Sequence, residues 1–252
     1  MINYLNVQAL REQFLSAKPF NHVVIDNFFL PEVAERIAGD FPKHDCDTWT
    51  VSYNNPVEIK KACSHWDRFP KTIYQAFFYL CSQGFVDQLE EIVGHKNVFA
   101  DYSLHGGGIH SHGPTGKLNM HKDYYIHPKI SLKRNYNIIV YMTPDWQPSW
   151  GGGLQLWSHN SKTDRPLACE SKYDIKFNRA ILFNTTQNSW HGLPDPIACP
   201  EGLARRSLAC YYLTKITNED EVEYRYRAKF VPNADQENDL SVKEFCDKRS
   251  KF

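Results

Sequence analysis

Residues 118–125 read LNMHKDYY and place two side chains that bind metal ions, His121 and Asp123, two positions apart. Side chains at i and i+2 of a β-strand point to the same face. If 117–123 is a strand, Asn119, His121 and Asp123 are expected to project together into one cavity. Two neutral imidazoles and one carboxylate on one face of an octahedral ion leave three adjacent positions open for other ligands. His121 and Asp123 are therefore candidates for two of three protein ligands.

The chain contains a second His-x-Asp triplet, His65-Trp66-Asp67. The segment RFPKTIYQAFFYL follows it and has the apolar spacing of a helix. A helix after this triplet provides no neighbouring strands that could bring a distant third ligand beside His65 and Asp67. The triplet at 121–123 is therefore the better candidate for a metal site.

The third ligand is expected to be a histidine from a later strand. His191 lies in FNTTQNSWHGLPDP (183–196), directly after the apolar segment RAILF. A single histidine is more often a surface residue or a hydrogen-bonded core residue than a ligand. Its place after a predicted strand nevertheless makes His191 the candidate third ligand.

A predicted carboxylate anchor lies fourteen residues beyond His191, where Arg205-Arg206-Ser207 opens the strand-like run RSLACYY. The period of two puts Arg205 and Ser207 on one face and Arg206 on the other. A planar guanidinium beside a hydroxyl suits a carboxylate group of a bound ligand. A surface ion pair is the usual alternative for an arginine.

From about residue 100 the chain consists of short β-rich runs separated by glycine and proline. We predict strands at 117–123, NIIVYM (137–142), GLQLW (153–157), RAILFN (179–184) and RSLACYYLT (206–214). Many short strands at close spacing predict a barrel or a sandwich.

The first hundred residues are predicted to be a mostly helical support. Apolar spacing predicts helices at 5–15, 31–40 and 71–93, the last broken or bent at Gly84, and a short strand at HVVID (22–26). After 215 the chain turns polar and is expected to end in an edge strand and a short helix. We treat 1–252 as one domain, with the support at 1–100, the β core at 100–215 and an extension at 216–252.

Composition excludes several classes of partner. The 29 basic and 29 acidic residues balance, which argues against nucleic acid and anionic membranes as partners. No apolar run approaches the roughly 18 residues of a membrane span, and Arg11 and Glu12 interrupt the region where a signal peptide would be apolar. The seven cysteines are scattered, without a C-x-x-C pair, which is typical of reduced thiols. We expect a soluble cytoplasmic protein.

The ordered set of motifs resembles the Fe(II)- and 2-oxoglutarate-dependent dioxygenases, in their prolyl 4-hydroxylase-like branch. The matching segments are His121-Lys122-Asp123, NIIVYMTPDW, GGGLQLW, FNRAILFN, His191 and Arg205-x-Ser207, over about residues 20–215. The resemblance implies a mainly β fold with helical support, a double-stranded β-helix (jelly roll, or cupin-like barrel).

The resemblance also implies the roles of individual residues. His121, Asp123 and His191 would ligate iron and so form the catalytic centre. Arg205 would pair with the distal carboxylate of 2-oxoglutarate, supported by Ser207, and Tyr141 would reach the same carboxylate. The candidate substrate residues are Asn119, Arg134 and Trp190.

The implied reaction couples O₂ and 2-oxoglutarate to hydroxylation of an unactivated C–H bond and releases succinate and CO₂. Fe(II), 2-oxoglutarate and O₂ are the expected cofactors, with ascorbate as a further candidate. The substrate is expected to be an amino-acid residue, a peptide or a small metabolite. Retention of the Asp123 carboxylate favours hydroxylation over halogenation.

Two other functions stay open at the level of sequence. One is a catalytically silent double-stranded β-helix that binds a ligand without turnover. The other is a cupin-type sugar isomerase, because His110-Ser111-His112 resembles the H-x-H of a cupin. A cupin would place a glutamate four or five residues later, where this chain has Gly116 and Lys117. His105, His110, His112 and His127 are expected in loops or at the rim of the pocket.

Overall fold

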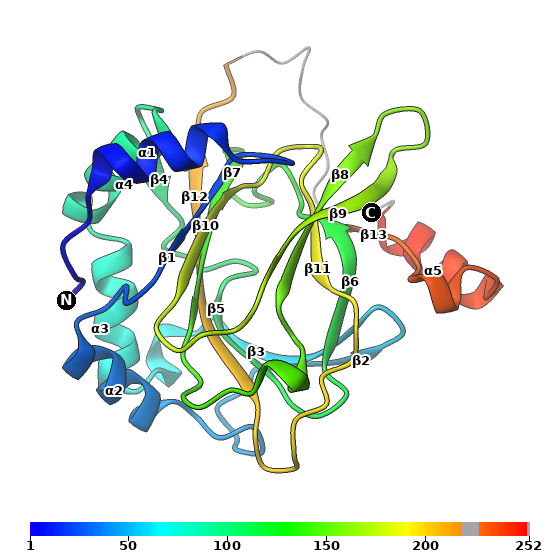
Figure 1. The fold of residues 1–252 in the computed structure, drawn as a ribbon, viewed down its shortest axis with the longest axis horizontal. Helices are drawn as coiled ribbons and strands as arrows, with labels where there is room; N and C mark the ends of the chain where they lie inside the picture. Colours follow the sequence, from blue (N-terminus) through cyan, green and yellow to red (C-terminus); the bar gives the residue numbers. More distant parts are fainter. Residues whose placement is uncertain (218–226, 251–252) are drawn as a thin grey trace.

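The computed structural model describes residues 1–217 and 227–250 (Figure 1). A curled antiparallel sheet dominates it, with neighbouring strands in the order β1-β10-β7-β12-β5-β3-β6-β11-β8-β9. The strands on this path are β1 (His22–Ile25), β3 (Glu58–Cys63), β5 (Gly108–His112), β6 (Lys117–Lys122), β7 (Lys133–Tyr141), β8 (Leu154–Asn160), β9 (Arg165–Tyr173), β10 (Ala180–Asn184), β11 (Trp190–Leu193) and β12 (Arg205–Thr214).

Three further strands extend this path at its sides. β2 (Val51–Asn55) pairs with β3, β4 (Phe99–Ala100) with β12, and β13 (Lys229–Phe230) with β6. The last pairing joins residues more than one hundred positions apart, since Phe230 lies opposite His121.

Four helices cover one outer face of the sheet, namely α1 (Val7–Ser16), α2 (Pro31–Asp40), α3 (Lys71–Leu80) and α4 (Gln83–Val93). They lie on the side of β1, β10, β7 and β12, whereas α5 (Leu240–Ser250) lies beside β13 at the other side of the molecule (Figure 1). The helices and one face of these strands share the largest apolar core, in which Phe77, Val140 and Leu208 are fully buried. Burial of this amphipathic surface is what stabilises short helices in water.

Helix ends follow local rules closely. α2 begins at Pro31, whose fixed φ suits a first helical position. The helical region 71–93 breaks at Cys81–Ser82 and not at Gly84 as expected, because the Ser82 side chain accepts a hydrogen bond from the Phe85 N–H and caps α4. Gly94 ends α4 in the left-handed conformation.

Five predicted strands beyond residue 100 are confirmed, whereas β5 and β9 were not predicted, and the first hundred residues were predicted only in part. The strand at 22–26 and the helices at 5–15 and 31–40 are confirmed, as are the edge strand and helix after 215. The strands β2, β3 and β4 of the first hundred residues were not predicted, so the support contributes more to the sheet than expected. Among the described residues, no helix combines the length and the apolar character needed to cross a lipid bilayer.

Candidate active site

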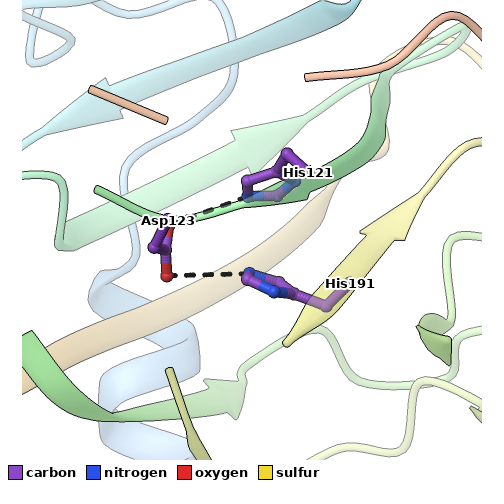
Figure 2. A group of neighbouring side chains, drawn as sticks. All are labelled: His121, Asp123 and His191. Atoms are coloured by element: carbon purple, nitrogen blue, oxygen red, sulfur yellow. Dashed lines mark ion pairs between the residues drawn. The ribbon is translucent and has the colours of Figure 1, made fainter. Parts of the chain in front are cut away.

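The sheet brings the three predicted metal ligands together. His121 lies on β6 and His191 on β11, directly opposite each other in the pairing of these strands, and Asp123 follows β6 by one residue (Figure 2). Nε2 of His121 is 3.8 Å from Oδ1 of Asp123, and Nε2 of His191 is 3.7 Å from Oδ2. One ligand atom from each residue lies within 4.8 Å of the other two. All three side chains are buried.

Both imidazoles are oriented in the same way. Nδ1 of His121 lies 3.0 Å from the carbonyl oxygen of Asn119, and Nδ1 of His191 lies 2.9 Å from that of Ser189. With the proton on Nδ1 donated to the carbonyl, each Nε2 presents its lone pair to the shared space, which is the usual orientation of metal-bound histidine. Burial and the neighbouring His191 lower the pKa of His121 to about 3. The residues present therefore fit a divalent metal ion.

The carboxylate of Asp123 is supported by two side chains. The Tyr211 hydroxyl donates to Oδ2 at 3.2 Å, and the Arg134 guanidinium lies 3.8 Å from Oδ1. Burial opposes ionisation, but His191 and Arg134 outweigh it and leave the pKa of Asp123 below its ordinary value. Asp123 is consequently ionised at neutral pH, as a metal ligand must be.

Arg134 is held rigidly at this position. Its guanidinium lies between the rings of Tyr124 and Tyr211, at 3.3 Å and 3.4 Å from their centroids, and donates to the carbonyl oxygen of His105. It also lines the cavity, as expected for a candidate substrate residue. A fully buried cation in this place offsets the charge of the carboxylate.

Arg205 and Ser207 face the same cavity from β12. The Arg205 guanidinium donates to the Gly152 carbonyl at 3.0 Å and to the Ser207 hydroxyl at 3.4 Å, and lies 4.8 Å from the centre of the Tyr141 ring. Arg206 points outward instead, where it donates to the Ala38 carbonyl and lies over Phe41. The predicted facing of the two arginines is confirmed.

Two buried groups beside Arg205 lack hydrogen-bond partners. They are the hydroxyl of Tyr141 and Nε2 of His112, neither of which has a partner among the described residues. Nδ1 of His112 lies 3.5 Å from the Arg205 guanidinium and accepts from it, so Nε2 carries a proton. Two donors without acceptors beside a guanidinium fit a carboxylate ligand. Tyr141 was predicted at this position, and His112 was not.

The substrate candidates Asn119 and Trp190 lie away from the cavity. Pairing between β6 and β11 shifts between His191 and Leu193, so Leu118 and His121 face inward together. The expectation that Asn119 shares the face of His121 is therefore wrong, and its amide donates to the Val231 carbonyl instead.

Trp190 precedes His191 on β11 and takes the opposite face. Its indole N–H donates to Nδ1 of His159, and its ring packs with Met120 and Val231. We find no support for contact of Trp190 or Asn119 with substrate.

A cavity of about 360 Å³ contains the metal ligands and Arg205. Sequence reasoning missed several side chains on its wall, which are Tyr53, Glu58, Lys60, Tyr124, Tyr211, Phe230 and Arg249. Phe230 of β13 stacks on the His121 ring, with centroids 4.8 Å apart and planes at 14°. Of the four histidines expected in loops or at the rim, His105, His110 and His112 line the cavity, the last two from strand β5. His127 is buried beside Asp101.

Residues 107–213 match the family model of the 2OG-Fe(II) oxygenase superfamily. The match covers 107 of the 252 residues. It includes His121, Asp123, His191 and Arg205, and the family implies Fe(II), 2-oxoglutarate and O₂ as cofactors, in agreement with the donor set. It also argues against a cupin-type isomerase. A comparison with curated protein sequences found no match.

Solved structures of 2OG-Fe(II) oxygenases share the fold. A prolyl-4-hydroxylase from Pseudomonas putida has a TM-score of 0.55 at 15% identity, covering 83% of this chain and 100% of that chain. A Trichoplax adhaerens prolyl hydroxylase, in complex with a peptide fragment of the hypoxia inducible factor oxygen degradation domain, has a TM-score of 0.52 at 18% identity, covering 82% and 90%. HygX from Streptomyces hygroscopicus, with nickel, 2-oxoglutarate and hygromycin B bound, has a TM-score of 0.53 at 12% identity, covering 83% and 89%. The predicted double-stranded β-helix is confirmed.

Proposed function

We propose that the protein is an Fe(II)- and 2-oxoglutarate-dependent dioxygenase that hydroxylates an unactivated C–H bond. The observation that carries this proposal is one buried cavity that contains both the His121–Asp123–His191 cluster and Arg205 with its unpartnered neighbours. The oxygenase family match over 107–213 supports it independently.

The protein residues supply position, charge and exclusion of water. When bound, Fe(II) supplies the activation of O₂ that is coupled to decarboxylation of 2-oxoglutarate to succinate and CO₂. His121, Asp123 and His191 would hold the ion on one side and leave the other side open. Arg205, Ser207, Tyr141 and His112 would hold the distal carboxylate and so fix the keto acid end toward the ion. Enclosure of these groups favours the productive reaction over side reactions.

The proposed substrate is a peptide residue or a small metabolite. The Trichoplax relative is complexed with a peptide fragment and HygX with hygromycin B, so neighbours of this fold accept both classes. We also propose a cytoplasmic location. Seven free cysteines support it, because reduced thiols are typical of that compartment.

An anaerobic titration tests the proposed function. Fe(II) added to the full chain with 2-oxoglutarate should produce the weak visible metal-to-ligand charge-transfer band of this enzyme class, and O₂ should then give succinate. Asp123→Ala should lose both signals while its circular dichroism stays unchanged. Asp87→Ala, a surface change on α4, is the matched control and should keep both signals.

The rival function predicts a different result. Wild-type protein that gives neither the band nor succinate would support a silent binding protein. Retained turnover in Asp123→Ala would remove Asp123 from the iron site.

A further inference from the structure

The cavity wall beyond the iron and 2-oxoglutarate sites is rich in positive charge. Lys60, Arg134, Arg227 and Arg249 line it, and Glu58 is the one carboxylate on this part of the wall among the described residues. The whole chain has no net charge, so the excess is local. A cleft lined by one sign of charge concentrates ligands of the opposite sign.

Glu58 holds two of these cations side by side. The Lys60 ammonium is 3.0 Å from one carboxylate oxygen, and the Arg249 guanidinium is 2.5 Å from the other. Only 4% of the Glu58 side chain is exposed, against 12% for Lys60 and 24% for Arg249. The carboxylate is therefore less exposed than the two cations, and all three side chains line the cavity. We call Lys60, Arg249 and Glu58 the cation bracket.

The bracket is fixed in place by its packing. Lys60 and Glu58 project from β3, and Arg249 reaches over from α5, where its guanidinium lies 4.5 Å from the centre of the Phe230 ring. Phe230 in turn stacks on His121. A ligand group bound at the bracket would thus lie next to the iron-binding histidine.

Charge balance shows that the bracket is not needed by the cofactors. The two charges of Fe(II) and the charge of Arg205 are matched by the Asp123 carboxylate and the two carboxylates of 2-oxoglutarate. Arg134 already lies beside Asp123, so Lys60, Arg227 and Arg249 are left with Glu58 as the one remaining carboxylate, which leaves a positive surplus on the described wall. An uncompensated cluster of cations in a partly enclosed site is unfavourable until an anion joins it.

We infer that the substrate is a small molecule with a carboxylate or phosphate group that binds Lys60 and Arg249. The inference rests on the proposed function and specifies its substrate class. A cavity of about 360 Å³ is at the small end of ligand pockets, which span roughly 300–1,000 Å³. The same cavity must also hold 2-oxoglutarate. The space that remains favours a compact metabolite over a folded segment of another protein.

Simple anions test this inference without knowledge of the substrate. The full chain, loaded anaerobically with Fe(II) and saturating 2-oxoglutarate, is titrated with sodium sulfate in one arm and sodium acetate in the other, at constant ionic strength with chloride. We expect a saturable change of the charge-transfer band in at least one arm. Sulfate represents a phosphate group and acetate a carboxylate group. The anion with the lower Kd shows which of the two groups the substrate carries.

Variants locate the bound anion. Lys60→Met and Arg249→Met should each raise the Kd of the anion about tenfold or more, as expected for loss of a charged hydrogen bond. Lys61→Met is the control on β3, because Lys61 donates to the His44 carbonyl and does not line the cavity. Lys248→Met is the exposed control on α5. If Arg249→Met lowers the melting temperature sharply, Lys60→Met alone decides the test.

The outcomes separate this inference from the proposed function. No band with Fe(II) and 2-oxoglutarate would contradict the proposed function itself. A normal band that no anion changes, or a change that is equal in wild type, Lys60→Met and Arg249→Met, would overturn the anionic substrate and leave the dioxygenase intact.

Discussion

At the scale of single residues, each imidazole of the proposed iron site is oriented by a backbone carbonyl two positions earlier. The carbonyls of Asn119 and Ser189 serve His121 and His191 in the same way. A backbone group orients each ring, so no side chain is needed for this purpose. The residue directly before each histidine can therefore place its side chain on the opposite face of the strand. Asp123 has no such carbonyl, and Tyr211 and Arg134 support it instead.

Removal of the Tyr211 hydroxyl should weaken metal binding. Tyr211→Phe deletes the donor to Asp123, and loss of a group that orients a metal ligand typically costs 10–100-fold in affinity. We expect the Kd of Fe(II), measured anaerobically, to rise by about tenfold. Tyr212→Phe is the matched control, because that hydroxyl donates to the Leu80 carbonyl in the helical core. It should lower stability by about 1 kcal/mol and leave the Kd of Fe(II) unchanged. Equal metal affinity in wild type and Tyr211→Phe would refute the supporting role.

Arg205→Ala should raise the requirement for 2-oxoglutarate. A hydrogen bond to a charged group contributes roughly 1.5–3 kcal/mol, which corresponds to about a 10- to 150-fold increase in the Kd of 2-oxoglutarate. The measurement is the anaerobic charge-transfer titration. Arg206→Ala is the control and should bind 2-oxoglutarate normally, because Arg206 contacts Ala38 and Phe41 outside the cavity. The reverse result would place the anchor at Arg206.

Residue types and spacing were sufficient to predict that His121, Asp123 and His191 come together and that Arg205 faces their cavity. Residue types and spacing did not predict which way Asn119 faces. The prediction assumed that side chains alternate strictly along the strand, and the register shift breaks that alternation. Lys60 and Arg249 had no signal of their own, because they meet only after β3 and α5 reach the same cavity from distant parts of the chain.

At the scale of elements, the strand pair β6–β11 creates the metal site. Gly192 follows His191, and a Cβ atom at this position would lie 2.7 Å from the Leu118 carbonyl oxygen and 2.9 Å from that of Asn119. The two strands approach this closely only because residue 192 has no side chain. The separation of the two ligand histidines therefore depends on a glycine.

Gly192→Ala should push β11 away from β6. We expect lower stability in urea unfolding, by about 1–3 kcal/mol as for other overpacked sites, and weaker Fe(II) binding, because His191 moves with its strand. Gly84→Ala is the matched control, since a Cβ atom there meets nothing within 4 Å. It lies inside helix α4 and should raise stability by about 0.5–1 kcal/mol. Unchanged metal binding in Gly192→Ala would show that the strand pair tolerates the added methyl group.

The strands that sequence reasoning missed lack a clear apolar face. β9 (RPLACESKY) is largely exposed, so it carries no alternating apolar pattern. β5 (GIHSH) turns His110 and His112 toward the cavity, where a core strand would place apolar residues. The positions that bind ligands are those where the apolar pattern fails.

At the scale of the whole molecule, the curled sheet separates two environments. One face packs on helices α1–α4 in an apolar core, and the other encloses a cavity of histidines and charged side chains. Adjacent residues such as Arg205 and Arg206 therefore serve different environments. The polar cavity makes the stability of the fold depend on pH.

The free energy of unfolding should decrease as pH falls below about 6.5. Burial and Arg205 hold the pKa of His112 well below its ordinary value, so the folded protein does not take up the proton that the unfolded chain accepts. The unfolded state then binds more protons, and stability rises with pH in this range. His112 should account for part of this decrease, because its pKa is low in the folded protein and ordinary in the unfolded chain.

Urea unfolding of the metal-free protein at pH 7.5, 6.0 and 5.0 measures this dependence. In His112→Asn the decrease should be smaller than in the wild type, whatever the absolute stability of the variant. An identical slope in wild type and variant would mean that His112 is protonated in the folded protein.

The stacking of Phe230 on His121 has a consequence for biosynthesis. The ligands on β6 and β11 are complete once residue 191 has been translated, but β13 comes some forty residues later and covers the open side of the His121 ring. A nascent chain that has not yet extended past β13 exposes this imidazole to the solvent. If iron binds at this cluster, a site loaded at that stage would be only half covered, and we expect stable insertion of the metal in the last steps of chain synthesis or in the released protein.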